Sequence, residues 1–287
     1  MTRLRQAYSA GIAILLALAG PVSERARAAD APPQRVVSMN LCTDQLAMML
    51  AAPGQLVSVS HLAAEPRASA MAGAAAAGGY RLNHGRAEEI WLMEPDLVIA
   101  GSYSNIATVE MLRRLGVPVL VMEPAYGLTD IPDRLRRVGA ALNRSAAAEA
   151  AATAFETTLS GLDTPEGDRP RAALYDANGY TPGERSLSGE IIAAAGFDNI
   201  AAEAGLPAGG HLPLELLAMA APEAVISGRP YPGASRAEEV LDHPVVQMLR
   251  EGTAGAVLTD RDWVCGTPHV LRAIADMRDL RRRMQGQ

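Results

Sequence analysis

Most side chains in this sequence that could hold a small molecule come directly after predicted β-strands. Aromatic residues make up only 4% of the chain, so each tyrosine or tryptophan at such a position stands out. Flat aromatic faces can stack on a large macrocycle or a catecholate chelate, and their polar tips can hydrogen-bond to it. The alternative is that each tyrosine only covers the core of its own half. The predicted ligand-contacting residues are Asn40, Cys42, His61, Tyr103, Tyr126, Tyr180, Arg229, Tyr231, Trp263 and Cys265.

Two cysteines, Cys42 and Cys265, lie just beyond predicted strand ends in opposite halves of the chain. They can form a disulfide, line the ligand pocket as separate thiols, or ligate a bound metal centre. A disulfide requires Cα atoms within about 7 Å of each other, which the spacing along the sequence does not reveal. The sequence therefore leaves these three interpretations open.

The remaining motifs favour binding over catalysis. The five histidines include no pair three to five residues apart, so they form no local metal-binding motif. The chain has no Gly-x-Ser-x-Gly elbow, no P-loop and no dinucleotide-binding glycine fingerprint. We therefore predict no catalytic residue, no resident cofactor and no protein-bound metal ion. An exported hydrolase is the enzyme alternative.

The strands and helices that position these side chains are predicted from short apolar runs that alternate with helical patterns. The first half predicts strands at 35–39, 56–60, 96–100 and 117–122, with helices at 43–52, 86–93, 106–115 and 130–142. The second half predicts strands at 171–175, 224–227 and 256–259, with helices at 187–195, 215–220, 245–250 and 268–283. Such alternation indicates parallel sheets covered on both faces, which bind ligands at the carboxyl ends of their strands. Residues 63–79 are expected to be irregular.

A long alanine-rich helix interrupts this alternation at 146–162, with Ser145 as its expected N-cap. At 1.5 Å per residue it would run roughly 25 Å, which is the size of a domain. We therefore predict an α/β fold with an N-terminal lobe at 33–142, a bridging helix at 145–163 and a C-terminal lobe at 168–287. Each lobe is expected to be a mostly parallel sheet flanked by helices.

One internal similarity relates the two predicted lobes. In the first, Glu88 is followed after six residues by Pro95-Asp96 and then by the strand residues Val98-Ile99. In the second, Glu215 is followed at the same spacing by Pro222-Glu223 and Val225-Ile226. Each unit predicts a helix that ends before proline, because the residue preceding proline disfavours helical geometry, and then a buried strand.

The first 28 residues have the features of a secretory signal. Arg3 and Arg5 precede an apolar run that is too short to span a bilayer, and Ala26-Arg27-Ala28 fits a cleavage site. A membrane anchor is disfavoured because Pro21 and charged residues follow the run. Removal of 1–28 takes away four of the 26 basic and one of the 32 acidic groups, leaving a net charge of −9. This acidic balance argues against nucleic-acid binding.

The order of these motifs resembles the helical-backbone class of periplasmic binding proteins, which serve importers of the ATP-binding-cassette (ABC) type. This group includes cobalamin-binding and ferric-siderophore-binding components. The resemblance extends over nearly the whole mature chain. The segments that carry it are 35–38, 88–99, 115–119, the alanine-rich helix, 188–199, 215–226, and Trp263 with Pro268.

The resemblance implies a monomer in the periplasm that holds a ferric siderophore or a cobalamin-type corrinoid in a cleft between its lobes. It implies delivery to permease subunits and their ATPase, with membrane contact only through the permease. By their positions in the repeated units, Glu88 and Glu215 are the expected docking residues for permease arginines. The alternatives are a zinc-binding or manganese-binding importer component, in which His61 and His269 would take part, and an exported sensor or binding module without a transport role.

Overall fold

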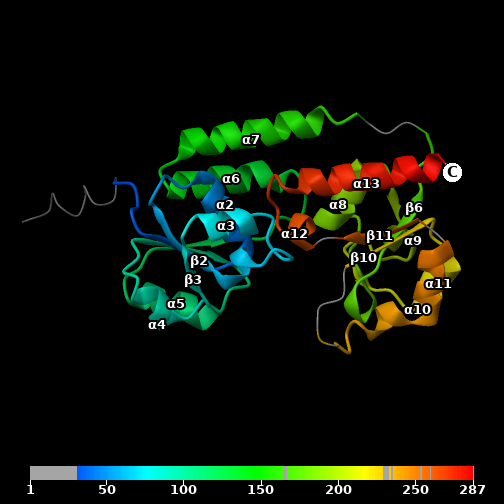
Figure 1. Ribbon diagram of the computed structural model, residues 1–287, viewed down its shortest axis with the longest axis horizontal. Helices are drawn as coiled ribbons and strands as arrows, with labels where there is room; N and C mark the ends of the chain where they lie inside the picture. The colour runs from blue at the N-terminus through cyan, green and yellow to red at the C-terminus, as the bar shows by residue number, and fades with distance from the viewer. Residues whose placement is uncertain are drawn as a thin grey trace, which may run out of the picture. The chain divides into compact units, whose positions relative to one another are not determined.

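The described part of the chain forms two larger parallel sheets, whose strands are rich in buried aliphatic residues, and one small antiparallel pair of strands (Figure 1). The computed structural model describes residues 31–163, 167–228, 233, 235–252, 254–258 and 260–286. The predicted leader at 1–28 lies outside these described residues. Residues 33–287 belong to one compact unit. The predicted α/β fold with mostly parallel sheets is confirmed.

The first sheet contains five strands, all parallel, in the spatial order β3-β2-β1-β4-β5. Its strands are β1 (Val36–Ser38), β2 (Leu56–Ser60), β3 (Arg81–Asn83), β4 (Leu97–Gly101) and β5 (Val119–Met122). The helices of this half are α2 (Leu41–Leu50), η1 (His61–Ala64), α3 (Ala72–Ala77), α4 (Ala87–Trp91), α5 (Ile106–Arg114) and α6 (Asp130–Ala141).

Helices cover both faces of the first sheet. Successive strand residues point to opposite faces, so Val36 and Val37, both fully buried in β1, enter different apolar clusters. Val36 packs in the cluster that contains residues of α2 and α6, such as Leu46 and Leu135. Val37 packs in the cluster that contains residues of α4 and α5, such as Ile90. The continuous apolar strands of the sequence follow from this burial on both sides.

The second sheet has four parallel strands in the order β11-β10-β6-β8. Its strands are β6 (Arg171–Leu174), β8 (Asp198–Asn199), β10 (Ala224–Gly228) and β11 (Ala254–Leu258), and the antiparallel pair is β7 (Tyr180–Thr181) with β9 (Gly210–His211). The helices are η2 (Ala177–Gly179), α8 (Leu187–Ala194), α9 (Ile200–Glu203), α10 (Leu214–Ala220), η3 (Glu239–Asp242), α11 (Pro244–Gly252), α12 (Asp260–Trp263) and α13 (Val270–Gln285).

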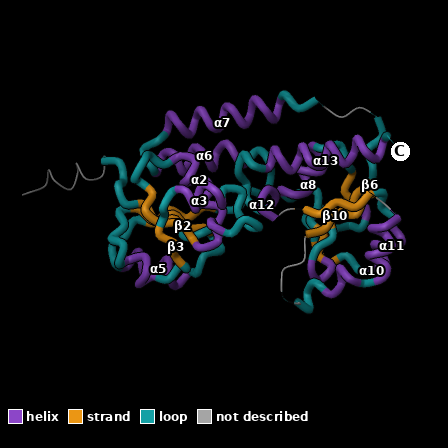
Figure 2. The backbone as a smooth tube through the Cα atoms, viewed as in Figure 1, coloured by secondary structure: helices purple, strands orange, loops and turns teal. Residues whose placement is uncertain are grey.

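Both faces of the second sheet are also covered (Figure 2). Leu174 of β6 packs in the same cluster as residues of α8 and α13, such as Ile191 and Ile274. Ala173, its neighbour in β6, packs with residues of α9, α10 and α11, such as Leu217. The cluster of Leu174 also contains Val36 of β1, so one apolar cluster continues from the first sheet to the second.

The predicted long helix is present as α7 (Ser145–Ser160), which follows α6 and precedes β6 in the chain. It packs on α6 through Ala148, Ala152 and Phe155, whose spacing of four and three residues places them on one face. The prediction that Ser145 is the N-cap is wrong. Asn143 adopts a positive φ of 55° after α6, and the chain turns so tightly there that Arg144 occupies the cap position.

Two further expectations for the first half are corrected. Residues 63–79 are not wholly irregular, because they contain the end of η1 and the short helix α3. Strand β3 was not predicted, since Arg81-Leu82-Asn83 has a single apolar residue and only Asn83 is buried. An edge strand of this kind is specified by its pairing with β2 rather than by its own hydrophobicity.

The internal repeat extends to backbone conformation. Strands β4 and β10 each follow a short helix and a proline, as the two sequence units predict. The residue before each proline adopts a positive φ, 49° at Glu94 and 43° at Ala221, although neither is glycine. Such a conformation is uncommon for non-glycine residues, and its occurrence at matching positions indicates that both units fold by the same local geometry.

Matching side chains stabilise the two repeated turns. The Arg35 guanidinium donates to Met93 O at 2.6 Å, and the Arg171 guanidinium donates to Ala220 O at 2.8 Å. The carboxylate after each proline accepts from the backbone of the same arginine, at 2.9 Å for Asp96 and 3.0 Å for Glu223. In each half, an arginine at the start of a strand therefore satisfies carbonyls at the end of the repeated helix.

Candidate functional site

The candidate site lies at the carboxyl edge of the first sheet. Because its five strands are parallel, all their carboxyl ends lie at one edge. His61 follows β2, Asn40 and Cys42 follow β1, Tyr103 follows β4 and Tyr126 follows β5. The structure therefore brings the predicted residues of the first half together at one edge, as the rule for parallel sheets requires.

Two tyrosines form the aromatic part of this edge. Tyr103 is 82% exposed and Tyr126 is 58% exposed, so their ring faces are open to solvent. The side-chain hydrogen bond between Tyr126 and the neighbouring Tyr103, together with the charge of Tyr103, raises the pKa of Tyr126 above its ordinary value. Two adjacent phenols with free ring faces can stack on a flat ligand and hydrogen-bond its polar rim.

Two cavities lie at this edge, after strands β4 and β5. A cavity of about 200 Å³ follows β4 and is lined by residues that include Ser102, Ser104 and Arg113. A cavity of about 260 Å³ follows β5, with Tyr126 in its lining. Its lining residues are Met122, Glu123, Pro124, Tyr126, Asp130, Asp133, Arg134 and Arg137.

Arg134 is the unusual member of the cavity after β5. Its side chain is only 7% exposed, and its Nε and Nη1 atoms are buried without a hydrogen-bond partner among the described residues. Burial lowers the pKa of Arg134. The nearby Asp130 carboxylate accepts from the backbone N–H groups of Tyr126 and Gly127, at 2.8 and 3.0 Å. Two buried guanidinium donors of a cavity-lining residue therefore lack an acceptor among the described residues.

Sequence reasoning did not select Arg134. A signal for it was present, because Arg134 lies three residues after Ile131 and four before Val138 on the buried face of α6. A charged residue on an apolar helical face is rarely buried without a partner, and this pattern marks it as a functional candidate.

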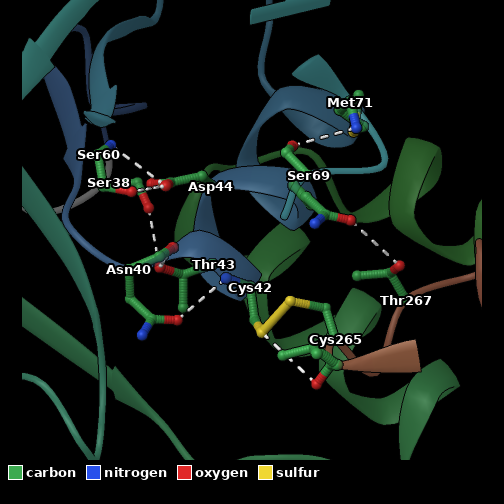
Figure 3. Close-up of a disulfide and its surroundings, with 12 residues drawn as sticks. Ser38, Asn40, Cys42, Thr43, Asp44, Ser60, Ser69, Met71, Cys265 and Thr267 are labelled. Carbon is green, nitrogen blue, oxygen red and sulfur yellow. Dashed lines mark hydrogen bonds between the residues drawn. A yellow bond between two sulfur atoms is a disulfide. The ribbon is translucent and has the colours of Figure 1, made fainter. Parts of the chain in front are cut away.

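The two cysteines form a disulfide, which confirms one of the three interpretations (Figure 3). Their Cα atoms are 5.0 Å apart although 223 residues separate them in sequence. The sulfur atoms are therefore not free thiols and do not act as metal ligands. Asn40 begins α2 beside this bond, and its Oδ1 accepts from Cys42 N at 3.1 Å. This N-cap explains why α2 begins two residues earlier than predicted.

A buried polar network lies under the same edge, and Figure 3 shows its central members. The Ser38 and Thr43 hydroxyls are 2.8 Å apart, and Asp44 accepts hydrogen bonds from both the backbone and the hydroxyl of Ser60. Burial raises the pKa of the Asp44 carboxyl from 3.8 to about 6. This network fixes the ends of β1 and β2, and with them the residues that follow these strands.

The second half contributes less to an exposed site. Tyr180 lies in β7 and is half-exposed. Trp263 is only 6% exposed and packs in the shared apolar cluster, so its ring presents no open face in this structure. A core position is physically expected for so large an apolar side chain. The predicted ligand contacts at Arg229 and Tyr231 lie outside the described residues.

Three contacts bring the second half against the candidate site. Leu128 N donates to the Glu190 carboxylate of α8 at 2.6 Å. The Thr267 hydroxyl lies 3.5 Å from the Gln45 side chain. Gly266 approaches the loop after β5 so closely that an added Cβ would lie 2.1 Å from Ala125 Cβ. Residues of the second half therefore contact the loop after β5, which also lines the cavity that contains Arg134.

Glu88 and Glu215 occupy matching positions away from this edge. Each lies in the first turn of its helix, α4 or α10, and each is exposed. Neither carboxylate has a hydrogen bond or an ion pair within the part of the chain that the structure describes. Both are therefore free to meet cationic groups outside this chain.

Two parallel α/β sheets, connected through one long helix and carrying exposed aromatic residues at a carboxyl edge, define a ligand-binding protein of the α/β class. A family model for the periplasmic binding proteins matches residues 36–261. The chain belongs to the periplasmic binding protein family, whose members are periplasmic binding proteins rather than enzymes.

Particular relatives agree with this assignment. A cobalamin-binding protein of Halobacterium salinarum is 27% identical over 205 residues, which are 69% of this chain and 55% of that relative, so the chain spans about half of its length. The apo heme-binding protein RhuT of Roseiflexus sp. RS-1 has a TM-score of 0.69 at 21% identity, covering 86% of this chain and 98% of that one. The vitamin B12-binding protein BtuF of Vibrio cholerae has a TM-score of 0.62 at 17% identity, covering 89% and 99%.

Two features are absent from the residues that the structure describes. No group of three or more histidine, cysteine, aspartate or glutamate side chains there is arranged to hold a metal ion. No helix in the same residues has the length and apolar character needed to cross a membrane.

Proposed function

We propose that this protein is the substrate-binding component of an ABC importer. It captures a ferric siderophore or a cobalamin-type corrinoid in the periplasm and delivers it to permease subunits with their ATPase. Family membership and the cobalamin-binding relative support the class of ligand. The observation that supports the proposal best is the carboxyl edge of the first sheet. Its exposed Tyr126 lines a cavity together with Arg134, two of whose guanidinium nitrogens have no partner among the described residues.

The size of this cavity indicates how such a ligand would bind. Ligand pockets usually have volumes of about 300–1,000 Å³, whereas this cavity has about 260 Å³. It can take a side arm of a bulky chelate but not the whole molecule. We infer that an anionic arm meets Arg134 while the flat part of the ligand covers Tyr103 and Tyr126.

We further propose that the halves act as lobes, 33–142 and 168–287, connected by the helix at 145–163. The ligand then lies between the carboxyl edges of the two sheets, where Tyr180, Arg229 and Tyr231 contribute from the second lobe. The close contacts of Leu128 with Glu190 and of Gly266 with Ala125 support a ligand position beside this junction. Residues 1–28 act as the leader that directs the chain to the periplasm.

A binding screen on the mature chain tests the ligand class. Purified protein would be titrated by calorimetry with cyanocobalamin, a ferric hydroxamate and a ferric catecholate. We expect saturable binding of at least one of them, and a loss of about tenfold or more in affinity for Tyr103→Ala or Tyr126→Ala, since aromatic contacts contribute about 0.5–1.5 kcal/mol beyond their buried area. Leu92→Ala, at an exposed position after α4, is the control. Absence of binding to all three ligands would refute the proposed function.

A charge reversal tests the docking of the permease. We expect Glu88→Arg and Glu215→Arg to abolish ligand uptake by cells while the affinity for the ligand is unchanged, because charge-assisted contacts with arginines become repulsive. Glu251→Arg, at another exposed position, should leave uptake intact. A loss of ligand affinity in the two variants would instead assign these glutamates to the binding site.

A further inference from the structure

Two histidines lie side by side at the carboxyl edge of the first sheet, next to the strands that precede them. His61 directly follows β2, and His84 directly follows β3, the strand that pairs with β2. Their ring centroids are 4.7 Å apart and their planes differ by 18°, so the two imidazoles are stacked. Both side chains are exposed to solvent. The residues are 23 positions apart in sequence, and only the pairing of β3 with β2 brings them together.

The residues that precede His61 and His84 are buried, and their hydrogen bonds fix the backbone at both histidines. Asn83 precedes His84, is fully buried, and donates through Nδ2 to Ser38 O at 2.8 Å and to Ser58 Oγ at 2.9 Å. Ser60 precedes His61, and its N–H donates to the buried Asp44 carboxylate at 3.2 Å. The pair is therefore carried by ordered backbone, as a preorganised binding group requires.

A carboxylate lies on one side of the pair. Glu89 accepts from His84 N at 2.9 Å, and its other oxygen is 3.6 Å from His84 Nδ1. Metal-binding histidines usually direct one ring nitrogen to a carboxylate, which orients the ring and leaves the other nitrogen for the metal. In this arrangement Nε2 of His84 is free, and the His61 ring has no hydrogen bond to any described residue.

The spacing of the rings suits one shared ion. Imidazole nitrogens bind transition metals at about 2.0–2.1 Å, so two nitrogens on one metal are at most about 4 Å apart. The stacked rings, with centroids 4.7 Å apart, are not in this geometry, because two nearly parallel ring planes cannot both contain one ion. Each exposed side chain must therefore rotate out of the stack to bring its nitrogen to a shared metal. Since no third protein ligand accompanies the pair among the described residues, the other donors must come from the ligand itself.

We propose that His61 and His84 together bind the metal of a chelate that has two adjacent open coordination positions. This inference rests on the proposed function, because it assumes that the transported ligand is a metal chelate. It narrows that class to complexes whose own donors do not saturate the metal. The pair occupies the end of the sheet edge opposite Tyr126, so metal and aromatic contacts lie along the same edge.

Nickel nitrilotriacetate is a direct probe, since it holds a transition metal in four donor positions and leaves two adjacent positions open. The tag-free mature chain would be titrated with this complex by calorimetry, together with His61→Ala, His84→Ala and the double variant. We expect saturable binding at one site per chain, a loss of about 100-fold in each single variant because the second contact is intramolecular, and no binding in the double variant. Retention of wild-type affinity in either single variant would overturn the inference.

His243→Ala is the matched control, because His243 is exposed and its Nδ1 already accepts from Val245 N. It should bind the probe within twofold of the wild type. Thermal melting of every variant checks that the fold is intact. The ferric chelates bound in the screen above then separate the two proposals. If such a chelate binds equally well to His61→Ala and His84→Ala, the histidine inference fails while the proposed function stands. If neither the ferric chelates nor cyanocobalamin binds although the nickel complex does, the proposed function fails and the metal-binding pair remains.

Discussion

Arg134 is a residue whose burial is expected to cost stability. A buried polar group without a partner costs about 1–3 kcal/mol, and a charged one costs more. Arg134 incurs this cost because its Nε and Nη1 atoms have no partner among the described residues. Natural sequences retain such groups mainly where function requires them. An incoming anion would supply the missing acceptors and remove the cost.

Arg134→Met separates these two effects, because methionine has a similar length without the charge. We expect the free energy of unfolding of the ligand-free protein to rise by about 1–3 kcal/mol, and the affinity for an anionic ligand to fall. Urea denaturation and calorimetry would measure the two quantities. Arg137→Met, at an exposed position of the same cavity, should not raise stability. A variant that is less stable than the wild type would show that Arg134 is a structural residue.

Asp44 is the second residue whose charged form is disfavoured by burial. It is fully buried at the start of α2, and one of its carboxylate oxygens has no hydrogen-bond partner among the described residues. Burial raises its pKa from 3.8 to about 6, and the hydrogen bonds from Ser38 and Ser60 oppose this only in part. The folded protein therefore binds this proton more tightly than the unfolded chain does.

A pH dependence of stability follows from Asp44. Its contribution is complete below pH 3.8 and is lost as the pH rises through about 6, and the difference between these pKa values corresponds to about 3 kcal/mol. Asp44→Asn mimics the protonated form, so we expect its stability advantage over the wild type to grow between pH 4 and pH 6. Urea denaturation across this range tests it. Asp133→Asn, an exposed carboxylate, should follow the wild type, and an identical pH profile for Asp44→Asn would contradict the prediction.

At the scale of elements, the contact between α6 and α7 depends on small residues. Helices approach most closely where side chains are absent, and Gly139 of α6 faces Ala148 of α7. An added Cβ at Gly139 would lie 2.1 Å from Ala148 Cβ. The alanine-rich composition of α7 therefore has a packing role, because it allows α6 and α7 to lie directly against each other (Figure 1).

Gly139→Ala tests this packing. Alanine favours helix by about 1 kcal/mol relative to glycine, but the steric overlap forces the helices apart, and overpacking costs about 1–3 kcal/mol. We expect a net decrease in the midpoint of thermal unfolding. Gly73→Ala in α3 is the matched control, since no atom lies within 4 Å of the added Cβ, and it should leave stability unchanged or slightly increased. Equal behaviour of the two variants would exclude a close approach at Gly139.

At the scale of the whole molecule, the disulfide joins two residues that are 223 positions apart in the sequence. It connects the start of α2, after the central strand of the first sheet, with the segment between α12 and α13 of the second half. The apolar cluster shared by the two sheets acts between the same halves. Together they restrict the relative motion of the two halves.

Replacing both cysteines by serine should lower the free energy of unfolding. In the chain-entropy description, opening a loop of 223 residues costs about 5 kcal/mol, and removal of natural disulfides typically costs about 2–5 kcal/mol. The unfolded chain also becomes more expanded, so the denaturant dependence of stability should steepen. Urea denaturation of the wild type with and without reductant would reproduce both changes. An unchanged midpoint in the double variant would show that the bond does not stabilise the fold.

The sequence by itself determined the local features of this protein. Strand and helix positions, the long helix and the repeated units around Glu88 and Glu215 follow from periodicity and proline placement, which act over a few residues. The rule for parallel strands also located Tyr103 and Tyr126 at one edge. Strand β3 escaped prediction because its single apolar residue is exposed, so only pairing with β2 reveals it.

Only the tertiary structure decided which distant residues meet and which become buried. It paired Cys42 with Cys265, placed His84 against His61, and enclosed Trp263 in the core. It also left two guanidinium nitrogens of Arg134 without a partner among the described residues. The physical reason is that burial and proximity depend on the order of strands and on helix packing, which are properties of the assembled chain. Local patterns specify the elements, whereas long-range packing specifies the chemistry that those elements share.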